Sequence, residues 1–448
     1  MNSNPFLKLV ACLLVASTSL SLFAGNPIVP DVGMADPHCY VFEGKVYLFS
    51  TRDLDANQKK FTAPDWNIWS SEDLVHWKHE RTITPSETYI GVGGKCWATE
   101  TVFKNGKYYF YFSNGSTDTG VMIADHPAGP YQDALKRPMI NASLTPGKEY
   151  DPTVLIDDDE QQTGYIIFGN HFPGDHKNKY RIARLSDDML SLHESPKEIV
   201  INDLDLMFAH NDKPTLHKRR GIYYLSGGST FAMSKDVYGP YQAIGNSGNG
   251  EHGLNFRGHG NYFTWNNQWF HTWCHFHLGR GVAKYRESYM SYLHYKDNGE
   301  MVTDTDFLEK HFATGVGQYN AGWDSIEAEW FMKSEGVAKR ENRAGGFAIH
   351  CARSGGYLCF PNMAELEKQN QLIFEVSSAN GARIEVRSKG PQGKLLGVCE
   401  VPATALSKSY IEVACELDDC QNVQDICLVF RGQGEDFLRL DRFKFAER

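Results

Sequence analysis

The stretch that decides the fold is Met34–Ser50, MADPHCYVFEGKVYLFS. It begins with a polar head, in which Asp36 precedes Pro37, and it continues as an alternating apolar strand. A turn at Gly44 then leads into an aromatic strand, because glycine adopts the backbone angles that tight turns require. The stretch therefore predicts a two-stranded hairpin with a carboxylate at its entrance.

The same pattern recurs four more times, at residues 96–113, 149–169, 210–228 and 257–275. Aromatic residues in the second strand of each copy lie roughly 46 to 62 residues apart, a period that is typical of propeller blades or solenoids. Further strands follow each hairpin and helical patterns are few, which favours four-stranded blades. We therefore predict an all-β fold with a five-bladed β-propeller over residues 26–318. The ionisable head residues are Asp36, Glu100, Asp151, Asp212 and His259.

The five polar heads predict one central site. In a closed ring the innermost strands of all blades converge on a single mouth, and a carboxylate buried there alone would be costly. Carboxyl groups that share a pocket differ in pKa, so one can donate a proton while another activates water. Hydrolysis of a glycosidic bond needs this pair. Two other interpretations stay open: the carboxylates can bind Ca²⁺, or the pocket can bind a sugar without cleaving it.

A different pattern begins near Trp323 and continues to Arg448. It has no repeat of the hairpin, and its strands alternate with a period of two at short, regular spacing, as in QLIFEVSSA at residues 371–379. This pattern is typical of a β-sandwich. We place the second domain at residues 323–448, with the boundary within residues 315–322.

The N-terminus predicts export. Lys8 precedes the apolar run Leu9–Ala16, and small residues follow, so residues 1–25 are predicted to be a signal peptide. Residues 9–12 resemble a lipoprotein box, but the apolar run before Cys12 is short, so we favour a periplasmic or extracellular protein over a lipoprotein. No other apolar run reaches the roughly 20 residues of a membrane helix. The net charge of −10 argues against a nucleic-acid partner.

The cysteine content permits disulfide bonds without defining them. The chain has 10 cysteines, and nine remain if Cys12 is removed with the signal peptide. Export would allow them to pair, but the connectivity cannot be read from the sequence. No spacing of cysteine and histidine predicts a zinc site.

At the polar heads the chain resembles glycoside hydrolase family 43, whose members are five-bladed propellers that invert the anomeric carbon. The resemblance covers about residues 26–315 and is strongest in NPIVPDVGMADPHCYVFEGKVYLFS and YDPTVLIDDD. It implies that Asp36 is the general base and that Asp151 orients the general acid and adjusts its pKa. The acid position falls on Asp212, where the family has a longer Glu. Glu100 and His210 are the reserve candidates for the acid.

The resemblance also implies contacts with an oligosaccharide or polysaccharide. Trp97, Glu100, His210 and His259 are expected to bind the substrate, although Trp97 would equally suit the core. His259 matches a histidine that, in some family members, helps to hold a central ion.

The C-terminal segment resembles carbohydrate-binding module family 6, through IEAEWF and FLRLDRFKF. This resemblance implies that Glu327, Glu329 and Asp441 bind a structural Ca²⁺. Arg439 and Arg442 replace an Asn and a Trp that are usual in the sugar cleft, so a purely structural module stays open.

We therefore expect an exported, inverting glycoside hydrolase that needs no cofactor for catalysis. Its expected mode is exo-acting, on arabinofuranosyl, β-xylosyl or galactose-configured linkages. The alternative is a catalytically inactive carbohydrate-binding propeller, because Asp212 replaces the family's Glu.

Overall fold

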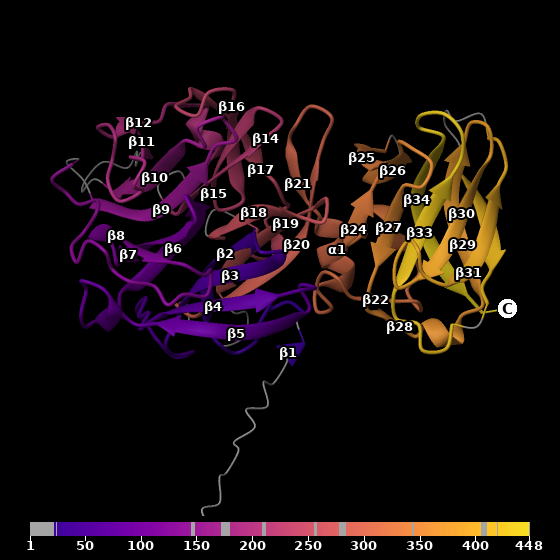
Figure 1. Ribbon diagram of the computed structural model, residues 1–448, viewed down its shortest axis with the longest axis horizontal. Coiled ribbons are helices and arrows are strands. Elements are labelled where there is room, and N and C mark those ends of the chain that lie inside the picture. The colour runs from indigo at the N-terminus through magenta and orange to yellow at the C-terminus, as the bar shows by residue number, and fades with distance from the viewer. Residues whose placement is uncertain are drawn as a thin grey trace, which may run out of the picture.

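The computed structural model describes residues 22–23, 25–144, 148–171, 180–207, 212–254, 258–276, 284–342, 345–404, 410–418 and 420–447. Two all-β bodies lie side by side, a propeller and a smaller sandwich, and this confirms the predicted fold class (Figure 1). The predicted signal peptide falls almost entirely outside the described residues, as does His210. Within the described residues, no helix has the length and apolar character needed to cross a membrane.

The propeller consists of five consecutive sheets, which are antiparallel except for the parallel pair of β13 and β17. Blade 1 contains β2 (Met34–Phe42), β3 (Lys45–Arg52), β4 (Trp66–Ser71) and β5 (His76–Ile83), with β1 (Leu22–Phe23) on its outer edge. Blade 2 contains β6 (Cys96–Lys104), β7 (Lys107–Asn114) and β8 (Asp118–Ala124). Blade 3 contains β9 (Lys148–Ile156), β10 (Gly164–His171), β11 (Arg181–Arg184) and β12 (Lys197–Glu198).

The last two blades complete the ring. Blade 4 contains β14 (Pro214–Arg219), β15 (Ile222–Gly227), β16 (Thr230–Ser234) and β17 (Tyr241–Asn246), with β13 (Ile201–Asn202) at its edge. Blade 5 contains β18 (Gly260–Trp265), β19 (Gln268–Phe276), β20 (Arg286–Tyr295) and β21 (Met301–Thr303). The five inner strands β2, β6, β9, β14 and β18 are neighbours around the axis, so the polar heads of the blades meet there.

Blade 2 differs from the predicted four-stranded unit. Among the described residues its sheet has three strands, and two isolated antiparallel bridges to β8, Thr119 with Ile140 and Ile123 with Gln132, take the place of a fourth. The connecting segment contains Pro127 and Pro130, which have no N–H to donate to a ladder. The fourth strand is therefore reduced to two separate pairs of residues.

Side-chain amides close the ring where its first and last blades meet. Asn261 on β18 accepts a hydrogen bond from the Cys39 N–H of β2 and donates one to the Cys39 carbonyl, each at 2.9 Å. Asn26 makes the same pair of contacts with Met290 on β20, at 2.8 and 3.0 Å. Asn261 thus fixes β2 against blade 5, and Asn26 fixes the segment before β2 against β20.

The sandwich packs two sheets face to face. The first contains β25 (Val337–Glu341), β26 (Phe347–Cys351), β34 (Leu438–Ala446), β29 (Gln371–Ser378) and β32 (Ile411–Glu416), with β23 (Ile326–Glu327) paired to β34. The second contains β24 (Lys333–Glu335), β27 (Tyr357–Phe360), β33 (Ile426–Arg431), β30 (Ala382–Ser388) and β31 (Leu395–Val401). A disulfide bond between Cys359 and Cys427 joins the adjacent strands β27 and β33.

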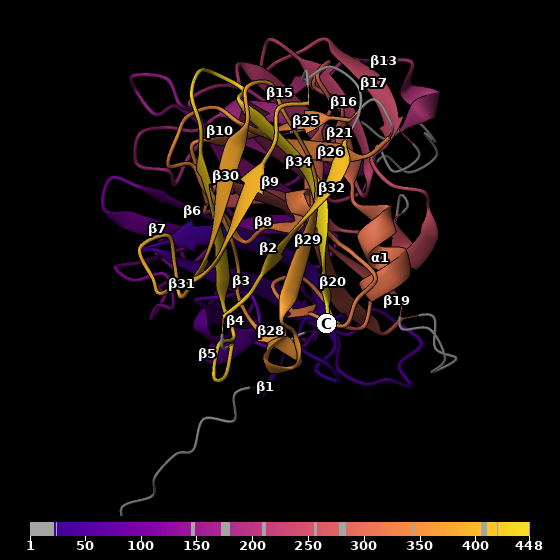
Figure 2. The same cartoon turned by 90° about the vertical axis from the view of Figure 1, so that its right-hand side faces the viewer.

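Short elements connect these sheets. The one α-helix of the described chain, α1 (Thr305–His311), lies between the propeller and the sandwich (Figures 1 and 2). Two two-residue strands, β22 (Tyr319–Asn320) and β28 (Met363–Ala364), pair in parallel. The described 3₁₀ turns are Pro85–Glu87, Leu204–Leu206, Glu251–Gly253, Ala328–Trp330 and Leu366–Lys368.

The propeller and the sandwich share one hydrophobic core. It runs from β2 and β20 through Phe307 of α1 and Tyr319 to Trp330, and on into the sandwich. Trp330 is fully buried, and its indole N–H donates to the Asp304 carboxylate at 2.5 Å. Gln268 of β19 donates to the main-chain carbonyl groups at both 329 and 331, each at 2.7 Å. The sandwich is therefore packed rigidly against blade 5.

Candidate active site

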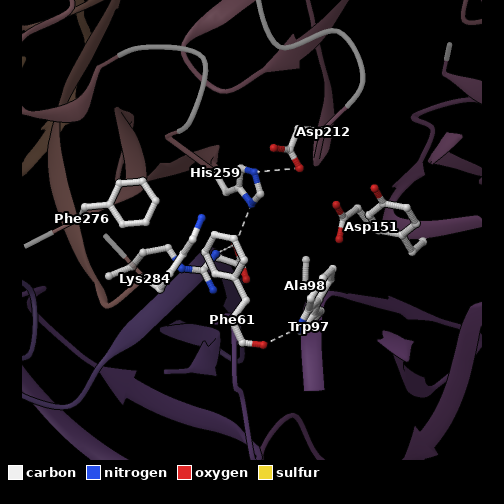
Figure 3. Close-up of a pocket in the computed structure, with 11 residues that line it drawn as sticks. Phe61, Trp97, Ala98, Asp151, Asp212, His259, Phe276 and Lys284 are labelled. Atoms are coloured by element: carbon white, nitrogen blue, oxygen red, sulfur yellow. Dashed lines mark hydrogen bonds and ion pairs between the residues drawn. The ribbon is translucent and has the colours of Figure 1, made fainter. Parts of the chain in front are cut away.

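A cavity of about 320 Å³ opens at the centre of the propeller, where the polar heads meet (Figure 3). It brings together five of the residues that the sequence predicts for the site and adds six that it does not. The predicted residues are Asp36, Trp97, Asp151, Asp212 and His259, and the added ones are Phe61, Ala98, Tyr150, Phe276, Lys284 and Arg286.

A β-bulge places each of the two Asp-Pro carboxylates in this cavity. The ladder between β2 and β3 shifts register at Asp36, and the ladder between β9 and β10 shifts at Asp151. Both residues have left-handed backbone angles, with φ of 50° and 55°. The following prolines cannot donate to the ladder, so the strand bends there and re-aims the preceding side chain. In both strands the Asp-Pro bulge therefore turns the aspartate carboxylate towards the propeller axis.

Two cations surround Asp36. Its Oδ1 accepts hydrogen bonds from Arg286 Nη1 at 2.9 Å and from His259 Nδ1 at 2.6 Å. Burial opposes ionisation of Asp36, but the charges of Arg286 and His259 outweigh it and hold the pKa of the carboxyl well below its usual range. Asp36 is therefore a carboxylate at any pH of interest.

A second carboxylate, Asp53 directly after β3, holds Arg286 in place. Arg286 Nε and Nη2 donate to its two oxygens at 3.0 Å each, and the Arg286 main-chain N–H donates at 2.8 Å. Asp53 is 1% exposed, so this bidentate pair is shielded from water. Neither residue can be predicted for the site from the sequence, because no local motif links positions 53 and 286.

His259 bridges two of the carboxylates. Its Nδ1 contacts Asp36, and its Nε2 lies 3.1 Å from Asp212 Oδ1. Burial lowers the pKa of His259, but the two carboxylates outweigh it and raise that pKa well above the ordinary value. The ring therefore carries a proton on both nitrogens. Both ring nitrogens thus contact carboxylates, and the central ion that the resemblance implied near His259 stays a prediction.

Asp151 and Asp212 carry opposite shifts. Burial and the neighbouring Asp212 charge raise the pKa of Asp151 to about 8. Partial burial also opposes ionisation of Asp212, but His259 outweighs it and lowers the Asp212 pKa. The two carboxyls therefore hold one proton between them near neutral pH, and without a ligand it resides on Asp151.

Glu100 lies beneath the cavity and does not line it. Its Oε2 accepts a hydrogen bond from Thr153 at 2.8 Å and pairs with the Lys213 ammonium at 3.5 Å. Ala98 occupies the position on β6 that corresponds to Asp36 and Asp151, because the β6 bulge lies between Trp97 and Thr99. Glu100 therefore lies below the residues that line the cavity, where its carboxylate pairs with the Lys213 ammonium.

Aromatic rings form the side walls of the cavity. Phe61 lies 6.2 Å from the Trp97 ring and 6.4 Å from the Phe276 ring, measured between centroids, and Trp97 lies 6.3 Å from Tyr150. Trp97 also donates its indole N–H to the Phe61 carbonyl at 3.3 Å. Polar groups at the base and aromatic walls together are typical of a small-molecule site.

Comparison with known proteins identifies this arrangement. The sequence model of Glycosyl hydrolases family 43 matches residues 24–301, more than half of the chain. The chain belongs to this family. The model of carbohydrate binding module family 6 matches residues 327–447, which cover the sandwich. The protein is therefore a glycoside hydrolase with an attached module of the carbohydrate-binding type.

Curated relatives and solved structures share this organisation. An arabinoxylan arabinofuranohydrolase of Paenibacillus polymyxa is 27% identical, covering 94% of this chain and 74% of that protein. An arabinoxylan arabinofuranohydrolase of Bacillus subtilis is 26% identical, covering 96% of this chain and 94% of that protein. The solved Bacillus subtilis family 43 arabinoxylan arabinofuranohydrolase has a TM-score of 0.56 at 24% identity and covers 95% of this chain and 98% of that one, so the fold is shared across both domains.

Of the three acids expected to bind Ca²⁺ in the sandwich, Glu327 lies near both Glu329 and Asp441. Burial is the largest cause of a raised pKa at each of them, to about 6 at Glu327, and each also feels another carboxylate nearby. Glu329 Oε2 is buried without a hydrogen-bond partner. Among the described residues no three such side chains converge tightly enough to form a finished metal site. The donor chemistry of Glu327, Glu329 and Asp441 suits Ca²⁺, and a bound ion would stabilise all three as carboxylates.

Proposed function

We propose that this family 43 protein is an exported, inverting glycoside hydrolase that removes terminal arabinofuranosyl, β-xylosyl or galactose-configured residues from oligosaccharides or polysaccharides. The observation that carries the proposal is the cavity, in which one carboxyl, Asp36, is fixed as an anion and the pair Asp151 and Asp212 holds one proton near neutral pH. This separation gives single-displacement hydrolysis its base and its acid.

Asp36 acts as the base. Both hydrogen bonds from Arg286 and His259 go to Oδ1, and none is made to Oδ2 by the described residues. Oδ2 therefore accepts a proton from water as that water attacks the anomeric carbon. One imidazole ring separates Asp36 from Asp212, in keeping with the roughly 6.5–9.5 Å between carboxyls that inversion needs.

Asp212 delivers the proton to the leaving sugar. It lies at the half-exposed rim of the cavity, where a glycosidic oxygen can reach it, whereas Asp151 is buried. The substrate displaces water from the half-exposed Asp212, whereas Asp151 is already buried, so binding raises the cost of an anion at Asp212 alone and moves the shared proton to it. Asp151 thus adjusts the pKa of the acid, as the family resemblance implied.

The size of the cavity favours exo action. At about 320 Å³ it lies at the small end of ligand pockets and takes a terminal sugar rather than the middle of a chain. The linkages follow from the relatives: two are arabinoxylan arabinofuranohydrolases, one from Bacteroides ovatus is a xylosidase/arabinosidase, and one from Aspergillus niger is a β-D-galactofuranosidase. Export is supported by the N-terminal apolar run and by the Cys359–Cys427 disulfide bond.

A panel of 4-nitrophenyl glycosides tests the proposal. The panel contains the α-L-arabinofuranoside, β-D-xyloside, β-D-galactofuranoside and β-D-galactopyranoside. Wild type should cleave at least one, and Asp36→Asn should lower kcat by about 100-fold to 10,000-fold, because the base is lost. Asp125→Asn, which changes an exposed aspartate paired with Lys107 on blade 2, is the matched control and should leave kcat unchanged.

Two outcomes would overturn the proposal. If Asp36→Asn keeps wild-type kcat on every cleaved glycoside, Asp36 is not the base. If wild type binds sugars but cleaves none of the four glycosides nor arabinoxylan, the protein is the inactive carbohydrate-binding propeller.

A further inference from the structure

One side of the cavity carries a lysine that the hydrolytic mechanism does not use. Figure 3 shows Lys284 beside Phe61 and Phe276, across the cavity from Asp151. Its ammonium lies 4.1 Å from the centroid of the Phe61 ring and 5.9 Å from that of Phe276. Its main-chain carbonyl accepts a hydrogen bond from Gln58 at 2.6 Å, which holds the backbone of Lys284 against the blade 1 loop.

The other cations of the cavity are committed to carboxylates. Arg286 contacts Asp36 and Asp53, and His259 contacts Asp36 and Asp212. Within the part of the chain that the structure describes, Lys284 forms no ion pair, and its contacts are with aromatic faces. The ammonium can therefore take up an anionic group from a ligand without first breaking a contact with a carboxylate.

The surroundings of Lys284 select the kind of anion. The ammonium lies beside Phe61 and Phe276, which stack on each other and offer apolar surface to a ligand, and an ammonium is a compact point charge that tolerates several orientations of its partner. The ionised Asp36 and Asp212 repel an incoming anion less than bare carboxylates would, because each already contacts a cation. These conditions suit a carboxylate attached to a sugar.

We propose that Lys284 binds the carboxylate of a uronic acid, so that the cavity prefers saccharides that carry such an acid over their neutral counterparts. The preference rests on the proposed function for its saccharide class. The carboxylate can belong to the sugar that enters the cavity or to a neighbouring sugar of the same chain, and the chemistry that Lys284 recognises is the same in both cases.

Calorimetric titration of the full chain tests the proposal at low salt. D-glucuronate is compared with D-glucose, and a xylo-oligosaccharide bearing one glucuronate is compared with the unsubstituted oligosaccharide of the same length. Wild type should bind the acidic member of at least one pair about 10-fold more tightly, as expected of one charge-assisted contact. A preference in the first pair places the carboxylate inside the cavity, and a preference in the second pair alone places it on a neighbouring sugar.

Two variants at position 284 show whether the lysine is responsible. Lys284→Gln should abolish the preference by weakening only the acidic ligand, whereas Lys284→Arg should keep most of it because the charge remains. If wild type binds both members of each pair equally, or binds none, the proposal is overturned. It is equally overturned if Lys284→Gln keeps the preference or weakens acidic and neutral ligands alike, since Lys284 would then only pack against the aromatic rings.

The binding test separates this proposal from the hydrolytic one. All titrations are repeated in Asp36→Asn, which removes the base but leaves Lys284 in place. A preference for the acidic ligand without turnover by wild type would refute the proposed hydrolysis and keep the uronate site. Turnover of neutral glycosides without a preference for the acidic ligand would support the proposed hydrolysis and refute the uronate site.

Discussion

Asp36 and Asp151 obey the same local rule, yet their protonation differs because of what surrounds each one. Both precede a proline at a bulge of an innermost strand. Asp36 faces two cations, whereas Asp151 is buried beside another carboxylate. Two identical dipeptides thus supply one ionised carboxylate and one protonated carboxyl group. The difference in their pKa values comes from residues of other blades.

The pH dependence of catalysis should follow from these shifts. The proton of the Asp151 and Asp212 pair is present below a pKa of about 8 and is lost above it, so kcat/KM should fall as the pH rises through about 8. The pKa of Asp36 is held far below its usual range, so Asp36 should add no acidic limb above pH 4. Rate profiles from pH 4 to 10 measure both limbs. Asp151→Asn should remove the limb near pH 8, and a limb that stays there would assign it to another group.

The role of Asp212 as the general acid should be visible in how the rate depends on the leaving group. Asp212→Asn should slow the release of an alcohol or sugar far more than that of 4-nitrophenolate, because only the poor leaving group needs a proton. Kinetics on arabinoxylan oligosaccharides and on the aryl glycoside measure the two rates. Asp212→Glu is the matched variant and should keep general-acid catalysis. Equal losses on both substrates in Asp212→Asn would exclude Asp212 as the proton donor.

At the scale of strands, the sequence predicts the repeats and misses contacts between them. The five hairpins follow from local alternation and turn chemistry, so the propeller, three carboxylates of its cavity and His259 could be predicted. Glu100 was misplaced because the bulge at Ala98 decides which side chain enters the cavity, and nothing in WATE reveals it. Lys284, Arg286 and Asp53 carry no local motif, since their contacts depend on blade 5 closing against blade 1.

Calcium should raise the thermal stability of the protein by binding at the edge of the sandwich. We predict that Ca²⁺ raises Tm by about 3 °C at saturation, since a ligand bound only by the folded state stabilises it. The ion would keep Glu327, Glu329 and Asp441 ionised, whereas burial now raises the pKa of each. Thermal scans with CaCl₂ and with MgCl₂ measure the effect, and Mg²⁺ should be weaker because it retains its waters. Asp441→Ala should abolish the response. An unchanged wild-type Tm would refute a calcium site.

For the whole molecule, the shared core makes the two domains one folding unit. Trp330 contacts Phe307 of α1 and donates to Asp304, so it joins the sandwich to blade 5. Trp330→Ala should cost about 3–5 kcal/mol and lower a single, common Tm in calorimetry. Phe103→Ala, at an exposed aromatic residue of blade 2, is the control and should change little. Two separate transitions, of which only one moves, would contradict a shared core.

The most direct test of the central claim is the anomer that is released first. Single displacement, with Asp36 activating water and Asp212 protonating the leaving group, inverts the anomeric carbon. Proton NMR of a fast reaction on 4-nitrophenyl α-L-arabinofuranoside, or on whichever panel glycoside is cleaved, follows the product before it mutarotates. The expected result is that the anomer opposite to that of the substrate appears first, which is the β-anomer for the arabinofuranoside. First appearance of the retained anomer would contradict the assignment of Asp36 as a base.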